Sequence, residues 1–138
     1  MRSLEKTLPQ DSIFSSPGYV REFLQAKFGC LPHEVFLCLY LDSRLHLIER
    51  QELFKGSLTH TTVYPREILK EAFFKNASAL IVTHNHPSGN PLPSLTVQEL
   101  TKTLSTALQL VDIPLLNHCI VNGSGFFSFS DTGLMKND

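Results

Sequence analysis

Two histidines, His84 and His86, stand two positions apart at the end of a predicted buried strand. Because side chains at positions i and i+2 of a strand point to the same side, both imidazoles can converge on one point. Two neutral imidazole nitrogens that face one point are half of a typical zinc site. The loop that follows contains Pro87, Pro91 and Pro93, which help to hold the rings in place. Taken alone, the spacing favours a simpler interpretation, two polar histidines at the mouth of a strand.

The pattern of apolar residues and chain breakers predicts the elements that position this pair. Proline and glycine exclude regular structure from residues 84–93. In chain order, the prediction is a helix at 17–28 ended by Gly29, strands at 35–41, 45–54 and 59–63, a helix at 65–75 ended by Asn76, a strand at 77–83, a helix at 94–111 with Ser94 as N-cap, and strands at 115–121 and 126–129. This order predicts an α/β fold, with one mixed β-sheet flanked by helices.

Length and composition limit the class of protein. The 138 residues fit one domain, with residues 1–16 as a flexible N-terminal lead and residues 17–138 as the folded part. The net charge of -1 excludes a globally basic nucleic-acid binder. The sequence has no apolar run of transmembrane length and no signal-peptide pattern. Three widely spaced cysteines, Cys30, Cys38 and Cys119, indicate reduced, buried thiols and a cytoplasmic protein.

The residues after the histidine pair extend the pattern. His84-x-His86 is followed by seven residues and then Ser94, which resembles the JAMM signature of MPN-domain metalloproteases: His-x-His, seven residues, Ser, two residues, Asp. The wider sequence resembles the RadC family from about Pro17 to Leu134. The motifs that carry this resemblance are Tyr64-Pro-Arg-Glu67, Asn76-Ala77, His84-Asn-His-Pro-Ser-Gly89, Pro93-Ser94, Leu110-Val-Asp-Ile113 and Phe127-Ser-Phe129.

The resemblance implies an MPN fold, a cytidine-deaminase-like three-layer arrangement. It implies that His84 and His86 are zinc ligands, and that Ser94 donates a hydrogen bond to the substrate oxyanion or to metal-bound water. MPN domains place a general-base glutamate at the base of the first strand, where this chain has Glu34, with Glu52 as the alternative. The implied reaction is hydrolysis of an amide or isopeptide bond in a protein or peptide, in which zinc activates water and a carboxylate removes the proton.

The sequence departs from the signature at position 97, where Val97 replaces the aspartate. Valine cannot bind a metal, so two protein ligands remain where a catalytic zinc site normally has three. Gln98 and Glu99 lie about 100° and 200° further round the helix and point away, and Asp42 is too loosely placed to substitute. Glu34 could replace the lost ligand, but the general base would then be lost. We therefore expect weak or absent zinc binding and impaired hydrolysis.

Two further departures concern His118 and the N-terminus. Asn117 precedes His118 where the family reads Asp-His, and we interpret His118 as a structural histidine on a strand. Full-length RadC proteins carry a helix-hairpin-helix module before this domain. Since only a short lead precedes Pro17, we expect that the chain resembles the short, single-domain members.

Two other functions compete with hydrolysis. Val97 favours a catalytically degenerate MPN module that binds a protein partner. A role with DNA, suggested by the family's historical link to DNA repair, is not supported by the charge balance. The basic residues that could form a patch are interpreted as solvated helix faces: Arg66, Lys70, Lys75 and Lys102. A homodimer through exposed strand edges is also open.

Overall fold

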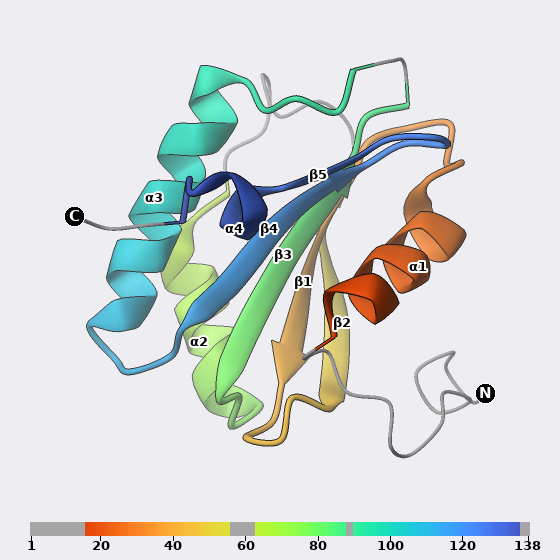
Figure 1. The fold of residues 1–138 in the computed structure, drawn as a ribbon. Helices are drawn as coiled ribbons and strands as arrows, with labels where there is room; N and C mark the ends of the chain where they lie inside the picture. The colour runs from red at the N-terminus through yellow and green to blue at the C-terminus, as the bar shows by residue number, and fades with distance from the viewer. Residues whose placement is uncertain (1–15, 56–62, 88–89, 136–138) are drawn as a thin grey trace.

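A computed structural model of the chain describes residues 16–55, 63–87 and 90–135. In these residues, five strands form one mixed sheet in the order β2-β1-β3-β4-β5 (Figure 1). β3 and β4 are parallel, and the other neighbouring pairs are antiparallel. The strands are β1 Val35–Leu41, β2 Leu47–Lys55, β3 Ala79–Asn85, β4 Leu115–Val121 and β5 Phe126–Ser128.

Helices cover both faces of the sheet and make three layers (Figure 1). α1 (Pro17–Phe28) packs on one face, against side chains such as Leu39 and Ile81. α2 (Pro65–Phe74) and α3 (Leu95–Gln109) pack on the other face, against side chains such as Phe36 and Val82. Successive strand residues alternate between these two cores, so β1 and β3 are buried on both sides. The predicted α/β fold, a mixed sheet flanked by helices, is confirmed.

Local signals at the helix ends agree with the predicted boundaries. Ser94 caps α3, and its Oγ accepts a hydrogen bond from the Val97 backbone N–H at 3.2 Å. Asn76, after α2, adopts the left-handed conformation with φ 55°, which stops the helix. Gly29 ends α1 for a different reason, since its φ is −64°. A Cβ there would lie 2.7 Å from the Gln25 carbonyl oxygen and 2.9 Å from that of Asn122, so close backbone approach requires glycine.

Two predicted strand ends need correction, and the other predicted ends among the described residues lie within two residues of the observed ones. β3 runs to Asn85 rather than ending at residue 83, because its pairing with β1 and β4 continues through His84. His84 is therefore a strand residue and not part of an irregular loop. Phe129 begins a short helix, α4 (Phe129–Thr132), instead of ending the last strand. The Ser128 Oγ caps this helix by accepting a hydrogen bond from the Asp131 N–H.

Other predictions have mixed outcomes. The strand predicted at 59–63 and the flexible lead lie outside the described residues, except for Val63 and Ser16. All three cysteines are free thiols, and Cys38 and Cys119 are buried as expected, but Cys30 is exposed. Among the described residues, no helix combines the length and apolar character needed to cross a bilayer.

Candidate metal centre

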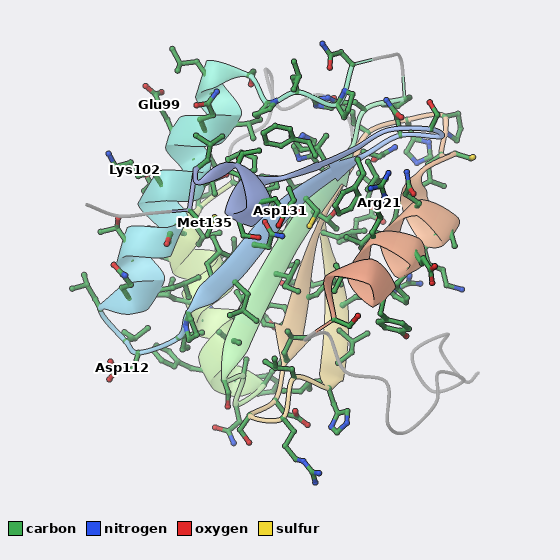
Figure 2. The ribbon with its side chains drawn as sticks, viewed as in Figure 1. Arg21, Glu99, Lys102, Asp112, Asp131 and Met135 are labelled. Atoms are coloured by element: carbon green, nitrogen blue, oxygen red, sulfur yellow. The ribbon has the colours of Figure 1, made fainter. Side chains whose placement is uncertain are left out.

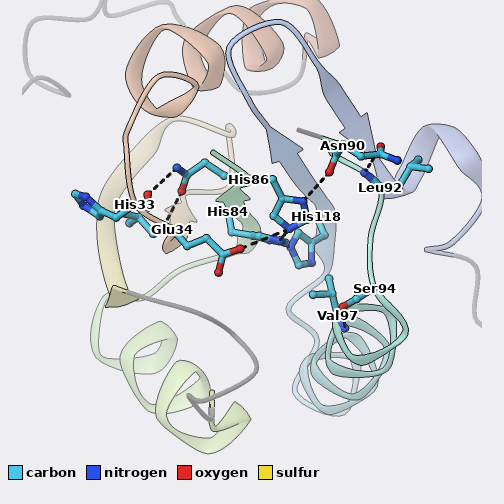
Figure 3. Close-up of polar contacts among 11 residues, drawn as sticks. His33, Glu34, His84, His86, Asn90, Leu92, Ser94, Val97 and His118 are labelled. Carbon is cyan, nitrogen blue, oxygen red and sulfur yellow. Dashed lines mark hydrogen bonds and ion pairs between the residues drawn. The ribbon is translucent and has the colours of Figure 1, made fainter. Parts of the chain in front are cut away.

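The two predicted histidine ligands lie together at one end of the sheet (Figure 3). His84 is the last but one residue of β3, and His86 directly follows the strand. Their Nε2 atoms are 3.0 Å apart. Two imidazole nitrogens on one tetrahedral zinc lie about 3.3 Å apart when each bond is about 2.0–2.1 Å. The expected convergence of the two rings is therefore present, within a few tenths of an ångström of a zinc-binding separation.

The other ring nitrogen of His86 fixes which nitrogen faces His84. His86 Nδ1 lies 3.0 Å from the backbone carbonyl oxygen of Asn90. A carbonyl oxygen only accepts, so Nδ1 carries the hydrogen and Nε2 of neutral His86 carries a lone pair. Metal-binding histidines typically make this second hydrogen bond. The sequence did not indicate that Asn90 contacts His86, because every residue type has a backbone carbonyl group.

Glu34 is the carboxylate that the structure brings to this pair. Asn85 anchors the segment before β1, because its Oδ1 accepts from the Val35 N–H at 2.7 Å and its Nδ2 donates to the His33 carbonyl at 2.8 Å. Glu34 Oε2 lies 3.9 Å from His86 Nε2. Glu34 Oε1 is buried without a hydrogen-bond partner among the described residues. A buried carboxylate oxygen is costly unless a cation or a donor satisfies it.

Ser94 and Val97 lie side by side at the start of α3 (Figure 3). The Ser94 hydroxyl accepts the capping hydrogen bond, so its own hydrogen remains able to donate. Val97 is 2% exposed and packs with Ile120 and Phe129 in a small apolar cluster. Hydrocarbon therefore fills the position at which the JAMM signature has an aspartate. Among the described residues, no group of three or more His, Cys, Asp or Glu side chains could hold a metal ion.

His118 supports the pair from inside the core. It is fully buried, and its Nε2 lies 2.9 Å from His84 Nδ1. Burial, with a smaller contribution from the nearby His86, lowers the pKa of His118 to about 3. Burial, followed by the neighbouring His118 and His86, also holds the pKa of His84 well below its ordinary value. Both rings are therefore neutral near pH 7, as metal ligation and its hydrogen-bonded support require.

Comparison with known sequences decides the family. A family model described as the RadC-like JAB domain matches residues 14–134. The chain belongs to this family. It is 44% identical over 134 residues to a UPF0758 protein of Polaromonas sp., and 46% identical over 134 residues to one of Leptothrix cholodnii. A UPF0758 protein of Aromatoleum aromaticum is 48% identical over 135 residues. Each comparison covers 97% of this chain and 60% of the relative, so the chain spans less than two thirds of the length of these relatives.

Glu52 and Asp42, the other carboxylates that the sequence suggested, both lie away from the histidine pair of this RadC-like JAB domain. Glu52 pairs with Leu37, whose side chain packs toward α1, so Glu52 lies on the opposite face of the sheet from His84. Asp42 follows the far end of β1, whereas Glu34 precedes its beginning. The geometry thus associates Glu34, rather than Glu52, with the histidines.

The outer surface of the RadC-like JAB domain bears the remaining charged residues considered above. Glu99 is exposed on α3, where Figure 2 shows it pointing outward beside Lys102. Of the basic residues, Arg66 is ion-paired with Glu67, and Lys75 is ion-paired with Glu71. The exposed Arg66 side chain fits the interpretation of a solvated helix face. That interpretation is wrong for Lys75, because its side chain is only 10% exposed and its Nζ lies 5.2 Å from the centroid of the Tyr40 ring.

Proposed function

We propose that this RadC-like JAB domain carries a reduced JAMM-type zinc centre, in which His84 and His86 bind the metal weakly and hydrolysis of amide or isopeptide bonds is impaired. The supporting observation is the buried, unpartnered Oε1 of Glu34 close to two histidine Nε2 atoms that lie 3.0 Å apart. The donors fit zinc in part, since two imidazole nitrogens face one point. Glu34 Oε2, at 3.9 Å from His86 Nε2, lies farther away than a second ligand of the same zinc would.

The residues around this point have separable roles in the proposed hydrolysis of a protein or peptide substrate. Zinc, when bound, would polarise the substrate carbonyl and make water acidic near neutral pH. Glu34 accepts the proton of the attacking water, which its carboxylate can do only while it is not itself a ligand. The Ser94 hydroxyl, free to donate, stabilises the developing oxyanion.

Val97 limits the proposed hydrolysis because it lowers the affinity of the site for zinc. Replacing an aspartate by valine removes one ligand and one negative charge that would balance Zn²⁺. The other polar groups of the proposed reaction are retained, so the defect lies in metal affinity. Slow hydrolysis that rises with added zinc is the expected behaviour.

Zinc titration of the purified, tag-free chain tests this proposal. The wild-type chain is expected to bind one zinc per chain by isothermal titration calorimetry, and His86→Ala is expected to lose this binding. His33→Ala is the matched control, because His33 is an exposed neighbouring histidine that points away from the pair (Figure 3). Hydrolysis of an isopeptide-linked peptide should follow the same order of variants. No zinc binding by the wild-type chain at millimolar zinc would overturn the proposal.

A second candidate function, a degenerate module that binds a protein partner, is favoured by the packing of Val97. Its side chain is buried against Ile120 and Phe129, so the ligand position is part of the apolar core. A binding module of this kind needs no metal to fold or to act. Unchanged cellular function in a His84→Ala strain would favour this candidate, and loss of function with intact folding would favour the zinc centre.

A further inference from the structure

We infer that a cavity on the face of the sheet that α1 covers binds a small apolar zwitterion of the dipeptide class, with the ligand's carboxylate at Arg21 and its ammonium group at Asp131. The cavity has a volume of about 470 Å³, which is in the range of pockets that bind small organic ligands. Its lining comes from α1, the turn after β1, the strands β3, β4 and β5, and the start of α4.

This cavity and the histidine pair lie on opposite faces of the sheet. Ile81 lines the cavity and packs in the core beneath α1. His84, three positions later on β3, stacks on Phe36, which belongs to the core beneath α2 and α3. Strand residues an odd number of positions apart point to opposite faces. The cavity is therefore separate from the candidate metal centre, and binding there does not depend on zinc.

Apolar side chains form the walls of the cavity. Two of them are buried in the core and three are half-buried around the opening: Val20 and Ile81, and Leu45, Leu116 and Phe126. Walls of this kind favour a ligand whose body is hydrocarbon, since binding removes apolar surface of both partners from water.

The more buried polar side chains of the cavity are already satisfied within the protein. Asn117 Oδ1 accepts from the backbone N–H groups of His118 at 2.8 Å and Ser130 at 2.9 Å, and Asn117 Nδ2 donates to Ser128 Oγ at 2.8 Å. Ser128 Oγ also accepts from the Asp131 N–H at 3.3 Å. These hydrogen bonds fix the shape of the cavity and leave recognition to the charged groups at its opening.

Arg21 and Asp131 bring one positive and one negative charge to the opening, from α1 and α4 (Figure 2). Arg21 Cζ lies 5.2 Å from the centroid of the Phe126 ring, a contact that holds the guanidinium over the apolar wall. Within residues 16–55, 63–87 and 90–135, neither side chain forms an ion pair. A ligand with a single charge would be repelled by one of the two groups, whereas a zwitterion complements both.

The positions of the two charges on different elements favour a dipeptide over a free amino acid. An amino acid carries its ammonium and carboxylate on one carbon atom, whereas a dipeptide separates them by an additional residue. The planar fork of Arg21 suits a carboxylate, which it can bind through two parallel hydrogen bonds. The carboxylate of Asp131 accepts from the ammonium group, and the two apolar side chains of the dipeptide contact the walls.

Titration of the full chain with the dipeptide L-leucyl-L-leucine, followed by amide NMR, tests this inference. The signals of Gly18 and Ser130, which line the cavity, should shift, and those of His84 and His86 should not. Arg21→Gln and Asp131→Asn, which change exposed side chains, should each weaken binding about tenfold, because a hydrogen bond between charged groups is lost. Arg66→Gln is the matched control, because Arg66 is an exposed arginine on α2, on the opposite face of the sheet.

Capped dipeptides assign each end of the ligand. The C-terminal amide should bind the wild-type chain about tenfold more weakly than the free dipeptide, and Arg21→Gln should not weaken it further. The N-acetyl dipeptide should show the same relation with Asp131→Asn. Equal affinity for free and capped dipeptides would overturn the inference. Shifts confined to residues outside the cavity, or no shifts at millimolar dipeptide, would also overturn it.

Discussion

Glu34 Oε2 lies 3.9 Å from His86 Nε2, while its second carboxylate oxygen is buried without a partner among the described residues. The position of this carboxylate is set by Asn85, which binds the backbone on both sides of Glu34. A negative charge is therefore held beside two histidine nitrogens that lie 3.0 Å apart, and it is poorly satisfied by protein groups. The arrangement favours a cation at this point.

Glu34→Gln should separate the role of this charge from the role of its shape. The amide keeps the size of the side chain but removes the negative charge and the proton acceptor. We expect zinc binding to weaken about tenfold, with hydrolysis reduced more strongly than binding, because the base is lost as well. Titration calorimetry and single-turnover assays at saturating zinc measure the two effects. Glu52→Gln, on the opposite face of the sheet, is the control that should change neither; tighter zinc binding by Glu34→Gln would contradict the assigned role.

His118 should make the stability of the metal-free chain depend on pH. Burial lowers its pKa to about 3, whereas the unfolded chain takes up the proton near the ordinary value of 6.5. The unfolded state therefore binds more protons between these values. The contribution of His118 to the free energy of unfolding is fully present above about pH 6.5. Below that pH it falls by about 1.4 kcal/mol per pH unit.

Urea unfolding of chelator-treated protein between about pH 7 and pH 5 checks this dependence. The folded His118→Gln variant should show a shallower loss of stability, because one of the two buried histidines that take up a proton on unfolding is gone and only His84 remains. His33→Gln, which removes an exposed histidine, should keep the wild-type slope. Equal slopes in all three proteins would show that His118 is not the neutral, buried group described here.

Two glycines of α1 and its C-terminal end should respond in opposite ways to alanine. At Gly29 a Cβ would meet two backbone carbonyl oxygens at 2.7 Å and 2.9 Å, so the backbone must shift. We expect Gly29→Ala to lower the free energy of unfolding by about 1–3 kcal/mol. Gly18, in the first turn of α1, has nothing within 4 Å of its Cβ position, and Gly18→Ala should leave stability unchanged or raise it by up to about 1 kcal/mol. Similar losses in both variants, measured by urea unfolding, would contradict the close approach at Gly29.

The sequence predicted the parts of this fold that depend on local pattern. The i and i+2 spacing of His84 and His86 predicted that the rings converge, and continuous apolar runs predicted the central strands. The extension of β3 through His84 could not be read locally, because it depends on pairing with two neighbouring strands. The contact between Thr101 and His118 was also missed, since a buried threonine on an apolar helix face has meaning only once β4 places His118 against it.

The predicted catalytic residues likewise divide into those that the sequence indicates and those that depend on long-range contacts. Glu34 follows from the family resemblance, but its preference over Glu52 needs the strand register, which places Glu52 on the other face. The role of Asn85 needs a contact between residues about fifty positions apart in the chain. Such long-range contacts leave no periodic signal, so sequence alone could not supply them.

Zinc affinity of Val97→Asp beside Val97→Asn is the most direct test of a centre that lacks only its third ligand. The two side chains have nearly the same shape, but the aspartate restores a ligand and a charge. Metal-free Val97→Asp should lose about 3 kcal/mol or more of stability, because its carboxylate enters an apolar cluster with Ile120 and Phe129, and zinc should recover this loss. The expected result is zinc binding at least about tenfold tighter than wild type in Val97→Asp and no gain in Val97→Asn. Equal zinc affinity in a folded Val97→Asp variant and Val97→Asn would contradict the assignment of position 97 to the metal centre.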